Sequence, residues 1–220
     1  MKLSFVLEEA RSGELSSLSA KDKTDRKIVT YINLALIALY GRFQLASEEA
    51  IITLRPDIAK TIYKMDSTDS DVRVAGQAMK DDEFMSIVAA FDESGTQLVV
   101  NNTNDPYSVL TVSYNQVQIP LLATNGYISL IYRKNPDMIT YVDDGNGNAV
   151  DANVPLPLQL LEALLHYVGY RAHGAVDGNI NTEQNTHYMR FEAACKNAEA
   201  LGVLTADDTV SASVNDKGFL

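Results

Sequence analysis

The stretch LLEALLHYVGYRAHGAVDG, residues 160–178, carries the strongest helical signal in the chain. Its apolar residues recur at helical spacing, two prolines stand just before it, and a glycine ends it. A second segment, NTEQNTHYMRFEAACKNAEALG at residues 181–202, follows after a short connection. Tyr188, Phe191, Cys195 and Ala198 recur there at intervals of three, four and three residues. The two segments therefore predict an antiparallel αα-hairpin.

The first 45 residues also predict helices. A short helix should end near Gly13, and a longer one should begin at an N-cap provided by Thr24 or Asp25. The longer helix follows the i, i+3, i+4, i+7 rule and also carries apolar groups on its other faces. We therefore expect it to be central, covered on more than one side. Its off-stripe apolar residues are Leu34, Ile37 and Ala38.

The middle of the chain predicts β-structure. Segments such as MSIVAAFDESGTQLVV (residues 85–100) and YNQVQIPL (residues 114–121) are rich in β-branched residues or alternate between polar and apolar ones. DESG between two apolar runs indicates a hairpin turn. This part is also acidic, because residues 61–155 carry thirteen Asp and Glu against five Lys and Arg.

These signals together predict an α+β fold. Its helical bundle consists of the N-terminal helices and the C-terminal αα-hairpin, residues 1–45 and 152–202. Residues 46–151 form a large antiparallel β insertion. Residues 203–220 are small and polar up to Phe219 and Leu220, so they cannot bury themselves and are expected to form an extended C-terminal arm.

Composition excludes several classes of function. The net charge of −11 disfavours ordinary nucleic-acid binding, which needs clustered Lys and Arg. The single cysteine, Cys195, cannot form an intrachain disulfide. The N-terminus lacks a secretory apolar core, and no apolar run approaches the roughly 20 residues that span a bilayer. We therefore expect a soluble protein made inside the cell, without a membrane partner.

The three histidines are the first candidates for a chemical site. His166 and His173 are seven residues apart, whereas two ligands of one metal on a helix need a spacing of three or four. His187 on the next helix could approach one of them, but no cysteine or acidic cluster completes a shell. The sequence favours packing histidines and no metal site.

Other motifs for catalysis or cofactor binding fail on inspection. DDGNGNAVD, residues 143–151, resembles a calcium loop at first, but Ala149 and Pro155 stand where that loop needs Gly and Glu. No nucleophile elbow, Walker motif or dinucleotide glycine pattern is present. Cys195 lies on an apolar stripe. We expect no catalytic residues, no cofactor and no enzymatic activity.

Two regions resemble the head–tail connector proteins of tailed phages. SAKDKTDRKIVTYINLALIALYGRF, residues 19–43, is similar to their opening helix, with matches that include Tyr31, Asn33 and Phe43. The hairpin sequence is similar to their closing helices. Its matching residues are Leu165, Tyr167, Val168, Tyr170, Arg171, Ala172, Asn185, Tyr188, Arg190, Phe191 and Ala194.

The resemblance implies a head-to-tail adaptor in the virion neck, made in the host cytoplasm. Such proteins form a ring, usually of twelve subunits, beneath the portal protein, with a tail nozzle or tail tube protein below. Genomic DNA passes through the lumen without specific binding, which an acidic surface suits. The residues expected to pack the helices of neighbouring subunits are Tyr31, Ile32, Leu36, Leu39, Phe43, Leu161, Leu165, Val168, Tyr188, Phe191 and Cys195.

The resemblance also implies that the C-terminal arm grips the portal. The residues expected in this contact are Val203, Leu204, Val210, Val214, Phe219 and Leu220. Two alternatives stay open at this point. The protein could be another neck or tail-completion protein that binds the tail tube, or a soluble metal-binding or enzymatic protein with dispersed carboxylates.

Overall fold

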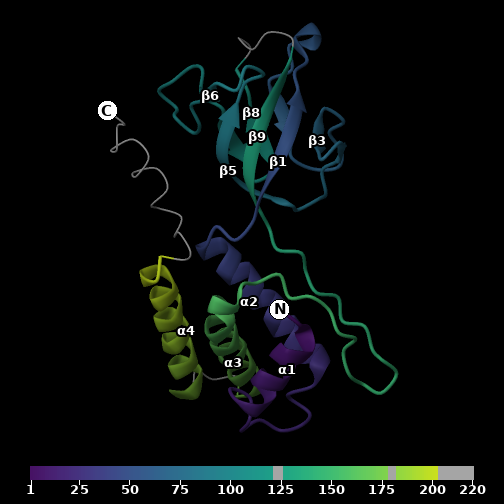
Figure 1. Cartoon of the computed structure of the whole chain (residues 1–220), viewed down its shortest axis with the longest axis vertical. Coiled ribbons are helices and arrows are strands. Elements are labelled where there is room, and N and C mark those ends of the chain that lie inside the picture. Colours follow the sequence, from purple (N-terminus) through teal and green to yellow (C-terminus); the bar gives the residue numbers. More distant parts are fainter. Residues whose placement is uncertain (121–125, 178–181, 203–220) are drawn as a thin grey trace. The chain divides into compact units, whose positions relative to one another are not determined.

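A computed structural model of the chain describes residues 1–120, 126–177 and 182–202, and only the backbone of 176–177 and 182–185. By compactness the chain divides into two units, Met1–Leu45 with Pro136–Leu220 and Ala46–Asn135. The described residues contain four α-helices, two short 3-10 turns and nine strands, so the predicted α+β class is confirmed (Figure 1).

The helical unit holds all four α-helices. Their bounds are α1 (Leu3–Ser12), α2 (Asp25–Arg42), α3 (Leu161–Asp177) and α4 (Thr182–Ala200), and the 3-10 turn η2 (Leu158–Leu160) precedes α3. Helix α1 buries one stripe at helical spacing and ends at Gly13, as predicted. Helix α2 starts after Thr24, the predicted N-cap. The buried residues of α2 are Asp25, Ile28, Val29, Ile32, Ala35, Leu36, Leu39 and Tyr40.

Helices α3 and α4 lie side by side (Figure 1). Three ring pairs fix their relative direction, because contacts move down one helix as they move up the other. Tyr167 meets Phe191 at 5.1 Å between ring centroids, Tyr170 meets Tyr188 at 5.2 Å, and His173 stacks on His187 at 4.8 Å. This order confirms the predicted antiparallel hairpin.

The segment before η2 is bound to the first two helices. The Asn33 side chain donates to the Ile139 carbonyl and accepts from the Ile139 amide, each at 2.9 Å. The Asp25 carboxylate accepts from the Ala149 amide at 2.7 Å. Residues 136–151, assigned to the β insertion from sequence, group with the helical unit. Backbone groups of Ile139 and Ala149 bond to side chains of α2.

The β unit consists of two antiparallel sheets. The larger has the order β4-β3-β1-β9-β5-β6 and the smaller has the order β2-β8-β7. The strand bounds are β1 (Ser47–Thr53), β2 (Ile62–Lys64), β3 (Val72–Val74), β4 (Gln77–Ala78), β5 (Phe84–Phe91), β6 (Gln97–Leu98), β7 (Leu110–Ser113), β8 (Gln116–Gln118) and β9 (Tyr127–Lys134), with the 3-10 turn η1 (Pro56–Ile58) after β1.

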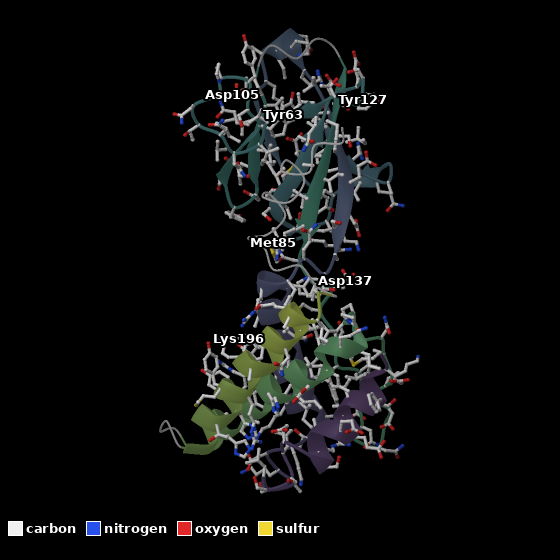
Figure 2. The ribbon with its side chains drawn as sticks, turned by 60° about the vertical axis from the view of Figure 1, so that its left-hand side comes forward. Tyr63, Met85, Asp105, Tyr127, Asp137 and Lys196 are labelled. Atoms are coloured by element: carbon white, nitrogen blue, oxygen red, sulfur yellow. The ribbon has the colours of Figure 1, made fainter. Side chains whose placement is uncertain are left out.

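Both sheets contribute to one core. Ile52 of β1 and Leu130 of β9 come from the larger sheet, and Tyr63 of β2 and Val117 of β8 come from the smaller one. Tyr63 is fully buried there and is labelled in Figure 2. The predicted DESG turn joins β5 to β6, with Gly95 at a positive φ of 82° that suits a residue without a Cβ.

The β unit begins and ends on neighbouring strands. Strand β1 pairs with β9 along its whole length, from Ser47 opposite Arg133 to Thr53 opposite Tyr127. The Lys134 amide donates to the Ala46 carbonyl at 3.0 Å, just where the unit starts. The two connections to the helical unit therefore leave the β unit at the same place.

Candidate functional site

Most of the residues predicted to pack between subunits are already buried inside one chain. They lie on α2, α3 and α4 and fill the interior of the helical unit, so their burial does not require a neighbouring copy. The buried members are Ile32, Leu36, Leu39, Phe43, Val168, Phe191 and Cys195. Tyr31, Leu161 and Leu165 are half-buried.

A few large apolar side chains stay exposed on α2 and α4. Tyr188 is 43% exposed. Ile37 on α2 is 48% exposed and Met189 on α4 is 71% exposed. Sequence periodicity singled out Ile37 but missed Met189, because that residue stands between apolar stripe positions in a helix with many polar neighbours.

An ion-pair network connects α2 to α4. The Arg42 guanidinium donates to Glu199 at 2.8 Å and to Glu192 at 2.7 Å. The hydrogen bond from Arg42 lowers the pKa of Glu192. The carboxylate of Glu192 in turn raises the pKa of the neighbouring Tyr188 hydroxyl through a hydrogen bond. Glu192, held by Arg42, thus restrains the exposed side chain of Tyr188.

The three histidines of the hairpin meet an acidic residue that sequence reasoning missed. Glu14 lies just after α1, and one carboxylate oxygen is 2.7 Å from Nδ1 of His187. Its other oxygen is 3.2 Å from Nδ1 of His166. The Glu14 carbonyl is 3.1 Å from Nε2 of His173. No local spacing signals this cluster, because Glu14 is about 150 residues away in the sequence.

The surroundings of His187 keep its ring close to α3. A Cβ at Gly169 would lie 2.8 Å from Nδ1 of His187, so the absence of a side chain at that position makes room for the ring. Burial lowers the pKa of His187, partly offset by the nearby carboxylate of Glu14. The imidazole is therefore neutral at neutral pH, the form that binds metals.

The remaining candidates have structural roles. Cys195 is fully buried, and burial raises the pKa of its thiol to about 11, which makes it a poor nucleophile. In the 143–148 loop, side-chain oxygens of Asp143 and Asp144 accept from backbone amides of the same loop. That arrangement is a turn closed by Asx hydrogen bonds. No helix in the described part of the chain is long and apolar enough to cross a membrane.

The predicted portal-binding arm lies outside the described residues. This applies to all six residues proposed for it, Val203, Leu204, Val210, Val214, Phe219 and Leu220.

The chain matches a known protein family. The family model described as SU10 adaptor protein matches residues 6–215, which is nearly the whole chain. The chain belongs to the SU10 adaptor protein family. This confirms the resemblance to phage head-to-tail adaptors read from the two helical regions. No curated protein matches this adaptor.

The match also extends the resemblance. Residues 46–135, which form the β unit and carry no motif recognised in the sequence, lie within the matched range. The β unit is therefore covered by the adaptor family model. A role in the phage neck follows for the protein as a whole.

Proposed function

We propose that this adaptor is a structural, non-enzymatic protein that forms a ring beneath the portal, links the portal to the tail and lets DNA pass through its centre. The match to the adaptor family over residues 6–215 carries the proposal. The number of subunits, twelve, comes from the resemblance stated above.

Exposed apolar side chains on α2 and α4 support self-assembly. Ile37, Tyr188 and Met189 are large apolar side chains that one chain leaves exposed. Burying such groups against a neighbour is favourable by about 25 cal/mol per Å² of apolar area. Each weak contact is reinforced when the ring closes and when the portal serves as a template.

The charge supports passage of DNA. The chain carries 29 acidic and 18 basic residues, for a net charge of −11. A ring with this charge repels phosphates, so that DNA slides through the lumen without adhering.

The test is co-sedimentation with the purified portal, followed by electron microscopy of the mixture. Full-length protein should co-sediment and form rings on the portal. Deletion of residues 203–220 should leave the far-UV circular dichroism of the folded protein but abolish co-sedimentation, because the arm is proposed to hold the portal.

A matched variant separately tests the exposed side chains of α4 that are proposed to contact a neighbouring subunit. Tyr188→Ser with Met189→Ser should fold, keep the arm and fail to form closed rings. Retained portal binding after the deletion would remove the arm from the proposal. Binding of the full-length protein to tail tubes but not to the portal would identify a tail-completion protein instead.

A further inference from the structure

Three distant segments bring metal-binding atoms together in the helical unit. Glu14 comes from the segment after α1, His166 from α3 and His187 from α4. One carboxylate oxygen of Glu14 and one ring nitrogen of each histidine all lie within 4.8 Å of one another. Among the residues that the structure describes, this is the one group of three or more His, Cys, Asp or Glu side chains that converges in this way.

The two ring nitrogens are buried without good hydrogen bonds. His166 and His187 are each 9% exposed. Nδ1 of both rings lies within 3.2 Å of a Glu14 oxygen, yet neither has a hydrogen bond of acceptable geometry. Buried polar atoms nearly always have a partner, and leaving one without a partner is destabilising. A cation held between the three side chains would satisfy both nitrogens.

We propose that Glu14, His166 and His187 bind a divalent zinc ion. Two imidazole nitrogens and a carboxylate match the ligand preference of zinc, whereas calcium and magnesium prefer oxygen ligands alone. Tetrahedral zinc ligands with bonds of about 2.0–2.1 Å lie about 3.3 Å apart. Zinc binding requires the three ligand atoms, which now lie within 4.8 Å of one another, to close to that spacing.

The groups around the three ligands suit a metal site. Nε2 of His166 is 3.6 Å from the Glu162 carboxylate, the type of partner that orients ligating histidines. The ring of His173 stacks on His187 and restrains its rotation. Gly169 leaves space for His187 as described above.

A cleft of about 350 Å³ next to Glu14 and His187 gives solvent access. Water from this cleft supplies the fourth ligand. Arg190 also lines the cleft, and its positive charge opposes a cation, so binding depends on the carboxylate of Glu14.

The ion would cross-link three segments of the helical unit. It would bind the segment between α1 and α2 to both helices of the hairpin, so binding would stabilise the folded state by mass action. This inference is independent of the proposed portal contact, because it concerns the stability of a single subunit.

The experiment uses the full-length protein purified without a histidine tag and treated with EDTA. Titration with zinc chloride should show one ion bound per chain and a rise in melting temperature. Cobalt chloride, used as a spectroscopic substitute, should give the intense visible absorption of a tetrahedral site. Glu14→Gln and His187→Gln should each weaken zinc binding at least tenfold, within the range of about 10–100-fold known for perturbed metal sites.

A control variant and a backup variant make the test decisive. Glu8→Gln removes an exposed carboxylate on α1 and should bind zinc within about threefold of the unmodified protein. If Glu14→Gln does not fold by circular dichroism, His166→Gln replaces it. The proposal is overturned if the unmodified protein binds zinc no better than Glu14→Gln, or if cobalt gives only the weak spectrum of an octahedral aqua ion.

Discussion

Asp25 is a buried charge on which several parts of the helical unit depend. It is the first residue of α2, is 3% exposed, and pairs with Arg11 of α1. Its other oxygen accepts from the Ala149 amide. One carboxylate thus joins two helices and the segment before α3, and its negative charge also favours the N-terminus of α2.

We predict that Asp25→Asn lowers the free energy of unfolding by about 1–3 kcal/mol, because a charged partner of Arg11 and a strong acceptor are lost. Urea unfolding followed by circular dichroism measures this. Asp22→Asn is the matched control: Asp22 is a more exposed carboxylate paired with Lys27, and its loss should have a much smaller effect on the free energy of unfolding. Equal effects of the two variants would contradict the role assigned to Asp25.

Lys60 has the corresponding place in the β unit. Its ammonium group is 2.7 Å from Asp69 and 2.8 Å from Asp71. Burial alone would raise the pKa of Asp69, but hydrogen bonds from Lys60 and from backbone amides lower it below the usual value. Burial alone would lower the pKa of Lys60, yet the two carboxylates raise it overall.

A pH dependence follows from these directions. Because the pKa of Asp69 is lower when folded, its stabilisation is complete above the unfolded value of 3.8 and is lost as pH falls through the folded pKa. Lys60→Met should therefore reduce unfolding free energy by about 1–3 kcal/mol at pH 7, and by much less near pH 2. Urea midpoints at both pH values measure the difference. Lys64→Met, with an exposed side chain nearby, should show no such pH dependence.

One amide side chain of α2 binds the segment after β9 near Ile139. Asn33 makes two hydrogen bonds with the backbone of Ile139, one as donor and one as acceptor. No aliphatic side chain can replace both, and the unpaired backbone groups would be left partly buried.

We expect Asn33→Ala to lower the free energy of unfolding by about 1–3 kcal/mol. Asn33→Asp keeps the acceptor and loses the donor, so its effect should be intermediate. Hydrogen exchange should show faster exchange of the Ile139 amide in Asn33→Ala. An unchanged exchange rate would mean that the segment is held by other contacts.

Local signals in the sequence predicted the elements well. The end of α1 at Gly13, the start of α2 after Thr24 and the β5–β6 turn were all readable, because each depends on a few neighbouring residues. The pairing of β1 with β9 could not be read, because about 80 residues separate the partners. The assignment of residues 136–151 differed for the same reason, since Asn33 and Asp25 bind that segment from over 100 residues away.

For the candidate functional residues too, local patterns were readable from the sequence and long-range contacts were not. The hairpin and the aromatic positions Tyr188 and Phe191 followed from periodicity, and the adaptor family followed from two helical patterns. Periodicity set Ile37 apart from the buried stripe, but it missed the exposed Met189, which stands among polar neighbours. Glu14 was missed because its partners are brought to it only by the fold.

The charge of the whole molecule leads to a prediction about DNA. A net charge of −11 means that few counterions would be released on contact with duplex DNA. We expect no retardation of duplex DNA by the purified protein in a gel shift, even at low ionic strength where electrostatic binding is strongest. A shifted band that disappears with added salt would contradict passive conduction.

Ala46 and Lys134 are adjacent, so the β unit is an inserted domain whose two ends lie side by side. The two ends of the β unit lie next to each other. The helical unit therefore needs only a short connection at this point, whatever domain is inserted there. A short glycine-containing linker could replace the whole β unit. A different domain with neighbouring ends could also be inserted at the same position. Changes within the β unit therefore need not disturb the helices.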